Sequence, residues 1–272
     1  MLLDAIILVV TKKVFTRFKA LDYKSFAWWL FVWIVILGLF LAPWFVHIQP
    51  AATEPYYLWL LLSLVFLAAN YNLLYYFGLE YEKLCVVEPF LLFNPIITIV
   101  IASLFYADER SWHVYVAAAV AGLALAWAHV HRRHLKLDRH LWAILGFSLL
   151  YGLEAVIIKQ LLAVYSPLTL YLIRAAMTAV FLWVVEKGKI MRITRRQIPH
   201  FLVIAASAIG ASTSVYMSYK TVGIGLTMGI LLLSPVLVYL ASVVYLKEKL
   251  QWKNLVASGV IMGAIIWLVI VR

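Results

Sequence analysis

Two opposite charges stand in the middle of long apolar segments. Glu154 lies in segment 139–163 and Arg174 in segment 166–186. If these segments cross a bilayer, a charge at the centre costs about 2.5–3.5 kcal/mol on insertion scales. We therefore expect both side chains to face the protein interior or water. In one possible arrangement they face each other. Two roles stay open: a structural ion pair, or a contact with a charged end of a small molecule.

Polar side chains also recur at matching positions of segments 56–79 and 198–219. Such groups need partners inside a membrane, either on a neighbouring helix or in an aqueous site. The matched pairs Tyr76/Tyr216 and Asn72/Ser212 favour a shared site. The residues predicted to bind a small molecule are Tyr76, Asn72, Asn94, Glu154, Arg174, Ser212, Tyr216 and Tyr219.

Three further residues could serve movement or coupling. Glu88 stands about one turn inside segment 84–106, where it could couple protons or favour the helix start through the helix dipole. Pro95 and Pro235 lie mid-segment, and each removes one backbone hydrogen bond. They predict either a fixed kink or a hinge. Lys159, five residues after Glu154, points to a different helix face and could snorkel to the outer surface.

A histidine cluster is the one hint of a metal. It spans His129 to His140, and a basic cytoplasmic loop explains it better than a metal site does. The chain has no glycine-rich phosphate loop and no G-x-S-x-G motif, so ATP-driven pumping and hydrolysis find no support. We expect no cofactor, no metal and no enzymatic activity.

Composition places the chain in lipid. Of its 272 residues, 66% are hydrophobic and 13% charged, against about 45–50% and about 25% in soluble domains. The net charge of +11 comes from short loops and not from a basic domain, which argues against nucleic acid as a partner. A lipid bilayer is the expected partner, and the plasma membrane the expected location.

The apolar runs predict about ten membrane-spanning helices, since each span needs about 20 apolar residues. Lys and Arg concentrate in alternate loops: loop 187–197 is rich in them, whereas loop 47–55 has none. The positive-inside rule then places loop 187–197 in the cytoplasm and both termini outside. The predicted spans are 2–18, 25–47, 56–79, 84–106, 111–130, 139–163, 166–186, 198–219, 224–246 and 252–271, of which the first is the weakest.

The two halves of the chain resemble each other. Residues 70–130 align with 210–270 at a constant offset, so that Pro95 falls on Pro235. The sequence therefore predicts two five-helix repeats, 1–130 and 139–272. An odd number of spans inverts one repeat relative to the other, which is the architecture of secondary transporters.

Two motifs carry a resemblance to a known family. One is the stretch from Ser234 to Glu248 followed by Trp252; the other is Asn94-Pro-Ile-Ile, with Tyr-Ala-Asp-Glu109 and Trp112 after it. Both resemble the end of an EamA-type domain, and two in tandem resemble the drug/metabolite transporter superfamily. The resemblance implies export of amino acids, drugs or related metabolites. Arg174 is similar to an arginine often found there in the family, whereas the first repeat has Trp28 or Trp29 near that place.

The sequence thus predicts an all-α, polytopic membrane protein with two inverted repeats, as a monomer or homodimer. It should move a small metabolite by alternating access, without covalent chemistry. A site containing Arg174 and Glu154 would suit a zwitterion. The alternatives are a non-transporting scaffold or receptor, or a membrane metal enzyme that uses the His129–His140 loop.

Overall fold

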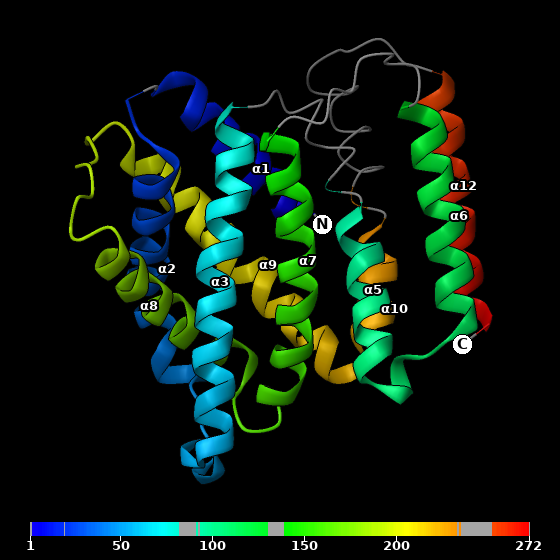
Figure 1. The fold of residues 1–272 in the computed structure, drawn as a ribbon, viewed down its shortest axis with the longest axis horizontal. Coiled ribbons are helices and arrows are strands. Elements are labelled where there is room, and N and C mark those ends of the chain that lie inside the picture. The colour runs from blue at the N-terminus through cyan, green and yellow to red at the C-terminus, as the bar shows by residue number, and fades with distance from the viewer. Residues whose placement is uncertain are drawn as a thin grey trace.

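The computed structural model describes residues 2–18, 20–81, 91, 93–129, 139–232, 234 and 252–271. These ranges contain helices and no strand, which confirms the all-α prediction. Figure 1 shows the long helices side by side, running up and down in one bundle. The helices are α1 (Leu2–Arg17), α2 (Tyr23–Phe45), η1 (Pro50–Thr53), α3 (Pro55–Tyr81), α5 (Phe93–Phe105), η2 (Ala107–Glu109), α6 (Trp112–His129), α7 (Arg139–Leu161), α8 (Pro167–Val185), α9 (Ile198–Thr221), α10 (Ile224–Leu231) and α12 (Trp252–Val271).

Five of the described helices are long and apolar enough to cross a membrane: α2, α3, α7 from Trp142, α8 and α9. Shorter apolar stretches are α5 and the Trp112–Ala124 part of α6. Large apolar side chains such as Phe40, Trp59 and Leu104 stand exposed on the outside of the bundle. Lipid is the environment in which that surface is stable, so the chain is an integral membrane protein. The predicted spans 84–106 and 224–246 lie partly outside the described residues.

Each helix of the first half packs on a helix of the second half. The main pairs are α3 with α7, α5 with α7, α6 with α12, α2 with α8 and α1 with α9, followed by α2 with α9 and α5 with α10. In Figure 1, α6 and α12 stand together at one side of the bundle. An aromatic cluster binds four helices at the other side: Phe26 contacts Phe15, Tyr76 and Phe201, with ring centroids 4.8, 5.0 and 5.1 Å apart.

The weakest predicted span forms a continuous helix. α1 buries Leu8, Thr11, Val14 and Phe15, and its main neighbour is α9. The Lys12 ammonium donates to the Leu79 carbonyl of α3 at 2.6 Å, which satisfies a charge inside an otherwise apolar surface. α1 is not among the helices long and apolar enough to span a membrane.

Backbone and side-chain hydrogen bonds tie the connections at both ends of the bundle. At one end the Gln49 amide donates to the Val164 carbonyl at 2.9 Å, and the Ser166 amide donates to the His47 carbonyl at 3.1 Å. At the other end the Met191 amide donates to the Ser25 hydroxyl at 2.9 Å. The α8–α9 connection therefore lies against the start of α2.

Glycines allow close helix crossings in some places and not in others. A Cβ on Gly152 would lie 2.7 Å from Ile101 Cδ1 and 3.3 Å from Thr98 Cα, so α7 and α5 meet there without space for a side chain. At Gly259 and Gly263, by contrast, no described atom lies within 4 Å of such a Cβ. The G-x-x-x-G pattern of α12 therefore marks no close crossing within the described chain.

Gly152→Val should destabilise the fold, because the added side chain must push the backbone of α5 away. We expect a loss of about 1–3 kcal/mol, the usual cost of overpacking, seen as a lower unfolding temperature in detergent. Gly259→Val is the matched control and should leave that temperature nearly unchanged. Equal effects of the two substitutions would contradict the close crossing of α7 and α5.

Candidate functional site

The two mid-span charges meet inside the bundle. Arg174 Nε lies 2.6 Å from Glu154 Oε1, and the two side chains are 5% and 2% exposed. The pair joins α8 to α7. Removing one partner of such a buried pair typically costs 3–5 kcal/mol, because the other charge then stays buried without compensation. The ion pair between Glu154 and Arg174, one of the two roles that the sequence allowed, is therefore present.

Tyrosines complete the surroundings of Arg174. The guanidinium donates from Nη2 to the Tyr71 hydroxyl of α3. Its Cζ also lies 5.5 Å from the ring centroid of Tyr71 and 5.8 Å from that of Tyr171. Such cation–π contacts favour a positive charge that has left water. Arg174 is thus held by one carboxylate, one hydroxyl and two aromatic faces.

Helical spacing brings these groups together. Residues three apart lie on the same helix face, and this spacing separates Tyr171 from Arg174 on α8. The same spacing separates Tyr151 from Glu154 on α7 and Tyr216 from Tyr219 on α9. Tyr71 of α3 reaches the group from a fourth helix, with its ring centroid 5.6 Å from that of Tyr151.

Tyr216 and Tyr219 form the α9 side of this group. The Tyr216 ring lies 6.0 Å from Tyr171 in an edge contact and 6.4 Å from Tyr219 in a stacked one. Both side chains are buried. The Tyr216 hydroxyl has no hydrogen-bond partner within the described part of the chain. A buried hydroxyl without a partner requires an explanation, and a bound water or ligand supplies one.

The other predicted residues have different neighbours. Tyr76 packs edge-on against Phe26 and Tyr75, within the aromatic cluster. Asn72 is buried, and its amide donates to the Ala68 carbonyl of its own helix at 2.8 Å. Ser212 lies on α9, one turn before Tyr216. Asn94 accepts a hydrogen bond from the Thr98 hydroxyl at 3.3 Å on α5.

The predicted coupling and hinge residues are only partly described. Glu88 and Pro235 lie outside the described residues. Pro95 lies on α5, whose described part begins at Phe93. The hinge and the coupling role stay predictions.

The histidine loop lies mostly outside the described residues. His140, at the start of α7, is buried and stacks on Tyr81 with ring centroids 5.0 Å apart. Across the described ranges, no three His, Cys, Asp or Glu side chains group as a metal site would require.

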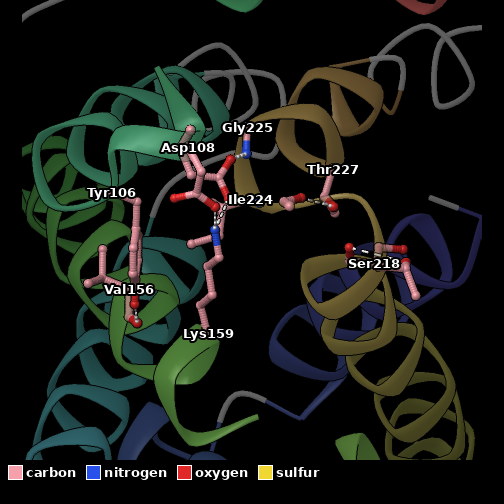
Figure 2. Close-up of polar contacts among 11 residues, drawn as sticks. Tyr106, Asp108, Val156, Lys159, Ser218, Ile224, Gly225 and Thr227 are labelled. Atoms are coloured by element: carbon pink, nitrogen blue, oxygen red, sulfur yellow. Dashed lines mark hydrogen bonds and ion pairs between the residues drawn. The ribbon is translucent and has the colours of Figure 1, made fainter. Parts of the chain in front are cut away.

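A second charged cluster, which the sequence analysis did not place in the site, lies near the end of α7. Lys159 Nζ lies 2.6 Å from Asp108 Oδ2 and 2.6 Å from Glu109 Oε1. It also lies 4.5 Å from the Tyr106 ring centroid. The Tyr106 hydroxyl donates to the Val156 carbonyl of α7 at 2.8 Å (Figure 2).

Glu109 connects this cluster to α10. Its two carboxylate oxygens accept hydrogen bonds from the amides of Ile224 and Gly225, each at 2.8 Å. These amides begin α10, where the helix dipole favours a negative charge. The ammonium of Lys159 lowers the pKa of the Asp108 carboxyl, which keeps this contact charged at neutral pH. The repeated acidic turn, Tyr-Ala-Asp-Glu109, was the sequence signal for this cluster.

Comparisons with known proteins agree with this architecture. Residues 139–270 match the model of the EamA-like transporter family. The EamA-like region holds Glu154, Arg174 and Tyr216, and the family is one of membrane transporters of the drug/metabolite type.

The fold of the whole chain also has a solved relative. A crystal structure of another protein superposes with a TM-score of 0.75 over 98% of this chain and 95% of that chain. At 13% identity the likeness concerns the fold alone. No curated protein sequence matches the chain.

The Glu154–Arg174 pair of the EamA-like region gives a stability prediction. Glu154→Leu and Arg174→Met should each lower the free energy of unfolding by about 3–5 kcal/mol, since each leaves one buried charge unpaired. The double variant should be more stable than the sum of the single losses implies. Thermal unfolding in detergent checks this cycle, and additive losses would contradict the direct pairing.

Proposed function

We propose that this EamA-like chain is a secondary transporter that moves a small metabolite through the bundle by alternating access. The observation that carries the proposal is the mid-span group around Arg174 and Glu154, which brings two buried charges together with five tyrosines. Intramembrane charges of this kind are costly and typically mark a substrate or ion pathway. Apolar packing alone would require neither charge.

The packing pattern supports two inverted repeats, 1–130 and 139–272. Exchanging α1 with α7, α2 with α8, α3 with α9 and α6 with α12 turns the pair α1–α9 into α7–α3. The pairs α2–α8 and α6–α12 map onto themselves. Helix pairs related in this way are expected when a two-fold axis relates the two halves. In transporters with this architecture, one half rocks against the other.

The proposed site consists of Arg174, Glu154, Tyr216 and Tyr219, with Asn72, Tyr76, Asn94 and Ser212 around it. A zwitterion suits this group, because its carboxylate could pair with Arg174 and its ammonium with Glu154. Both exchanges keep each buried charge compensated. Amino-acid-like or drug-like metabolites, moved outward across the plasma membrane, are therefore the substrates we propose.

Transport in proteoliposomes tests the site. With a panel of radiolabelled amino acids as probes, wild type should accumulate at least one. Arg174→Ala should abolish that flux, because it removes the cation that holds a carboxylate. Tyr216→Ala should reduce it by about tenfold or more, the equivalent of about 1.4 kcal/mol of lost binding.

Tyr81→Phe is the matched control for these variants. Tyr81 is exposed at the end of α3, so loss of its hydroxyl should leave flux unchanged. Unchanged flux in both Arg174→Ala and Tyr216→Ala would remove the proposed site. Wild type without flux of any probe would remove amino acids from the proposed substrates.

The direction of insertion gives a separate prediction. In a Cys85→Ser background, a cysteine at Lys189 should react with a membrane-impermeant thiol reagent only from the cytoplasm, because the basic loop 187–197 stays inside. A cysteine at Glu54, exposed at the other end of the bundle, should react only from outside. Labelling of Lys189→Cys from outside would overturn this topology.

A further inference from the structure

We propose that Lys159, Asp108, Glu109 and the first residues of α10 form a latch. The latch closes the bundle at the end opposite loop 187–197 and opens during the transport cycle. The inference rests on the proposed alternating access, because a closure that opens has a role only if the site faces each side in turn. The contacts that carry it are electrostatic and come from three separate elements.

The latch adds charged contacts between α7, the turn after α5 and the start of α10. α7 packs mainly on α3 and α5, and α10 packs mainly on α5. Lys159 joins the end of α7 to the turn between α5 and α6, and Glu109 of that turn binds the start of α10 (Figure 2). Removing the ammonium would therefore break both ion pairs of α7 with this turn and leave the carboxylate that holds α10 without its cation.

The latch stands between the candidate site and one end of the bundle. Lys159 follows Glu154 by five residues on α7, a rise of about 7.5 Å along the helix. α7 ends two residues later, at Leu161, next to the connection that starts α8. Loop 187–197 follows the other end of α8. A molecule leaving the Arg174–Glu154 site away from that loop must therefore pass the level of Lys159.

The charges are placed so that the closure can be reversed. Asp108 is 68% exposed, Lys159 19% and Glu109 6%. Exposure to water therefore decreases from Asp108 through Lys159 to Glu109. Water can replace the hydrogen bonds between Asp108 and Lys159 when the elements separate. Screening by solvent keeps the exposed part of this contact weak.

Glycines make the closed state tight. Gly223 has φ +90°, a backbone conformation that L side chains rarely adopt, and its Cβ would lie 2.8 Å from Glu109 Oε1. A Cβ on Gly225 would lie 3.2 Å from Glu109 Oε2. A side chain at Gly223 would therefore displace the carboxylate, and one at Gly225 would crowd it.

Thiol accessibility in a Cys85→Ser background tests the latch. Thr227→Cys is the probe, because Thr227 is buried on α10 one turn inward from the latch. A membrane-impermeant thiol reagent is added on the face opposite loop 187–197. Lys159→Met should raise the labelling rate about tenfold, since the closed population then falls, whereas Lys159→Arg should keep labelling slow.

Lys220→Met is the matched control, because this exposed lysine lies at the same end of the bundle and makes no described contact with the latch. It should leave the labelling rate unchanged. Where Lys159→Met fails to fold, Glu109→Gln serves instead: it keeps the shape and one acceptor, loses the charge, and should raise labelling in the same direction. A folded Lys159→Met or Glu109→Gln protein labelled at the wild-type rate would overturn the latch.

The same preparations separate this inference from the proposed function. Faster labelling without flux of any amino-acid probe would support the latch and leave the transported molecule to be found elsewhere. Normal flux with unchanged labelling in both charge variants would support transport and overturn the latch.

Discussion

The structure depends on one constraint: a charge that leaves water must find its partners inside the chain. Lipid offers no hydrogen bonds, so each charged side chain inside the bundle has to be matched by another helix. Arg174 and Glu154 meet this requirement across α8 and α7. Lys12 meets it through a carbonyl of α3. These contacts fix which helices are neighbours, whereas apolar side chains would accept many neighbours equally.

Tyrosine suits this environment because it combines an apolar ring with one polar atom. Around Arg174 the rings of Tyr71 and Tyr171 shield the guanidinium, while the hydroxyl of Tyr71 accepts a hydrogen bond from it. The hydroxyl of Tyr216 is left without a partner in the described chain. The side chains of this group are thus buried against one another, while one hydroxyl still lacks a hydrogen-bond partner. A bound ligand or water would supply that partner.

Much of this was accessible from sequence, since hydrophobic length and helical spacing depend on local residues alone. The helical fold and the membrane setting follow from such patterns. The contact of Glu154 with Arg174 was one arrangement that the sequence left open. Tyr71 and Tyr171 were missed, because nothing in a single helix says which neighbour it will face. Lys159 was predicted to snorkel toward the surface. It contacts an acidic turn some fifty positions earlier in the chain, and this partner is decided only by the packing of α5 against α7.

α7 carries both charged clusters, and their spacing explains how the two can be related. Five residues correspond to a rotation of about 140° around a helix, so Glu154 and Lys159 point to different sides of α7. One side meets α8 and α3, which hold the candidate site; the other meets the α5–α6 turn and, through Glu109, α10. A helix clamped on both sides transmits a shift of one cluster to the other as a rigid element. Substrate contact at Glu154 and closure at Lys159 would then be coupled through α7 itself, with no other moving part required between them.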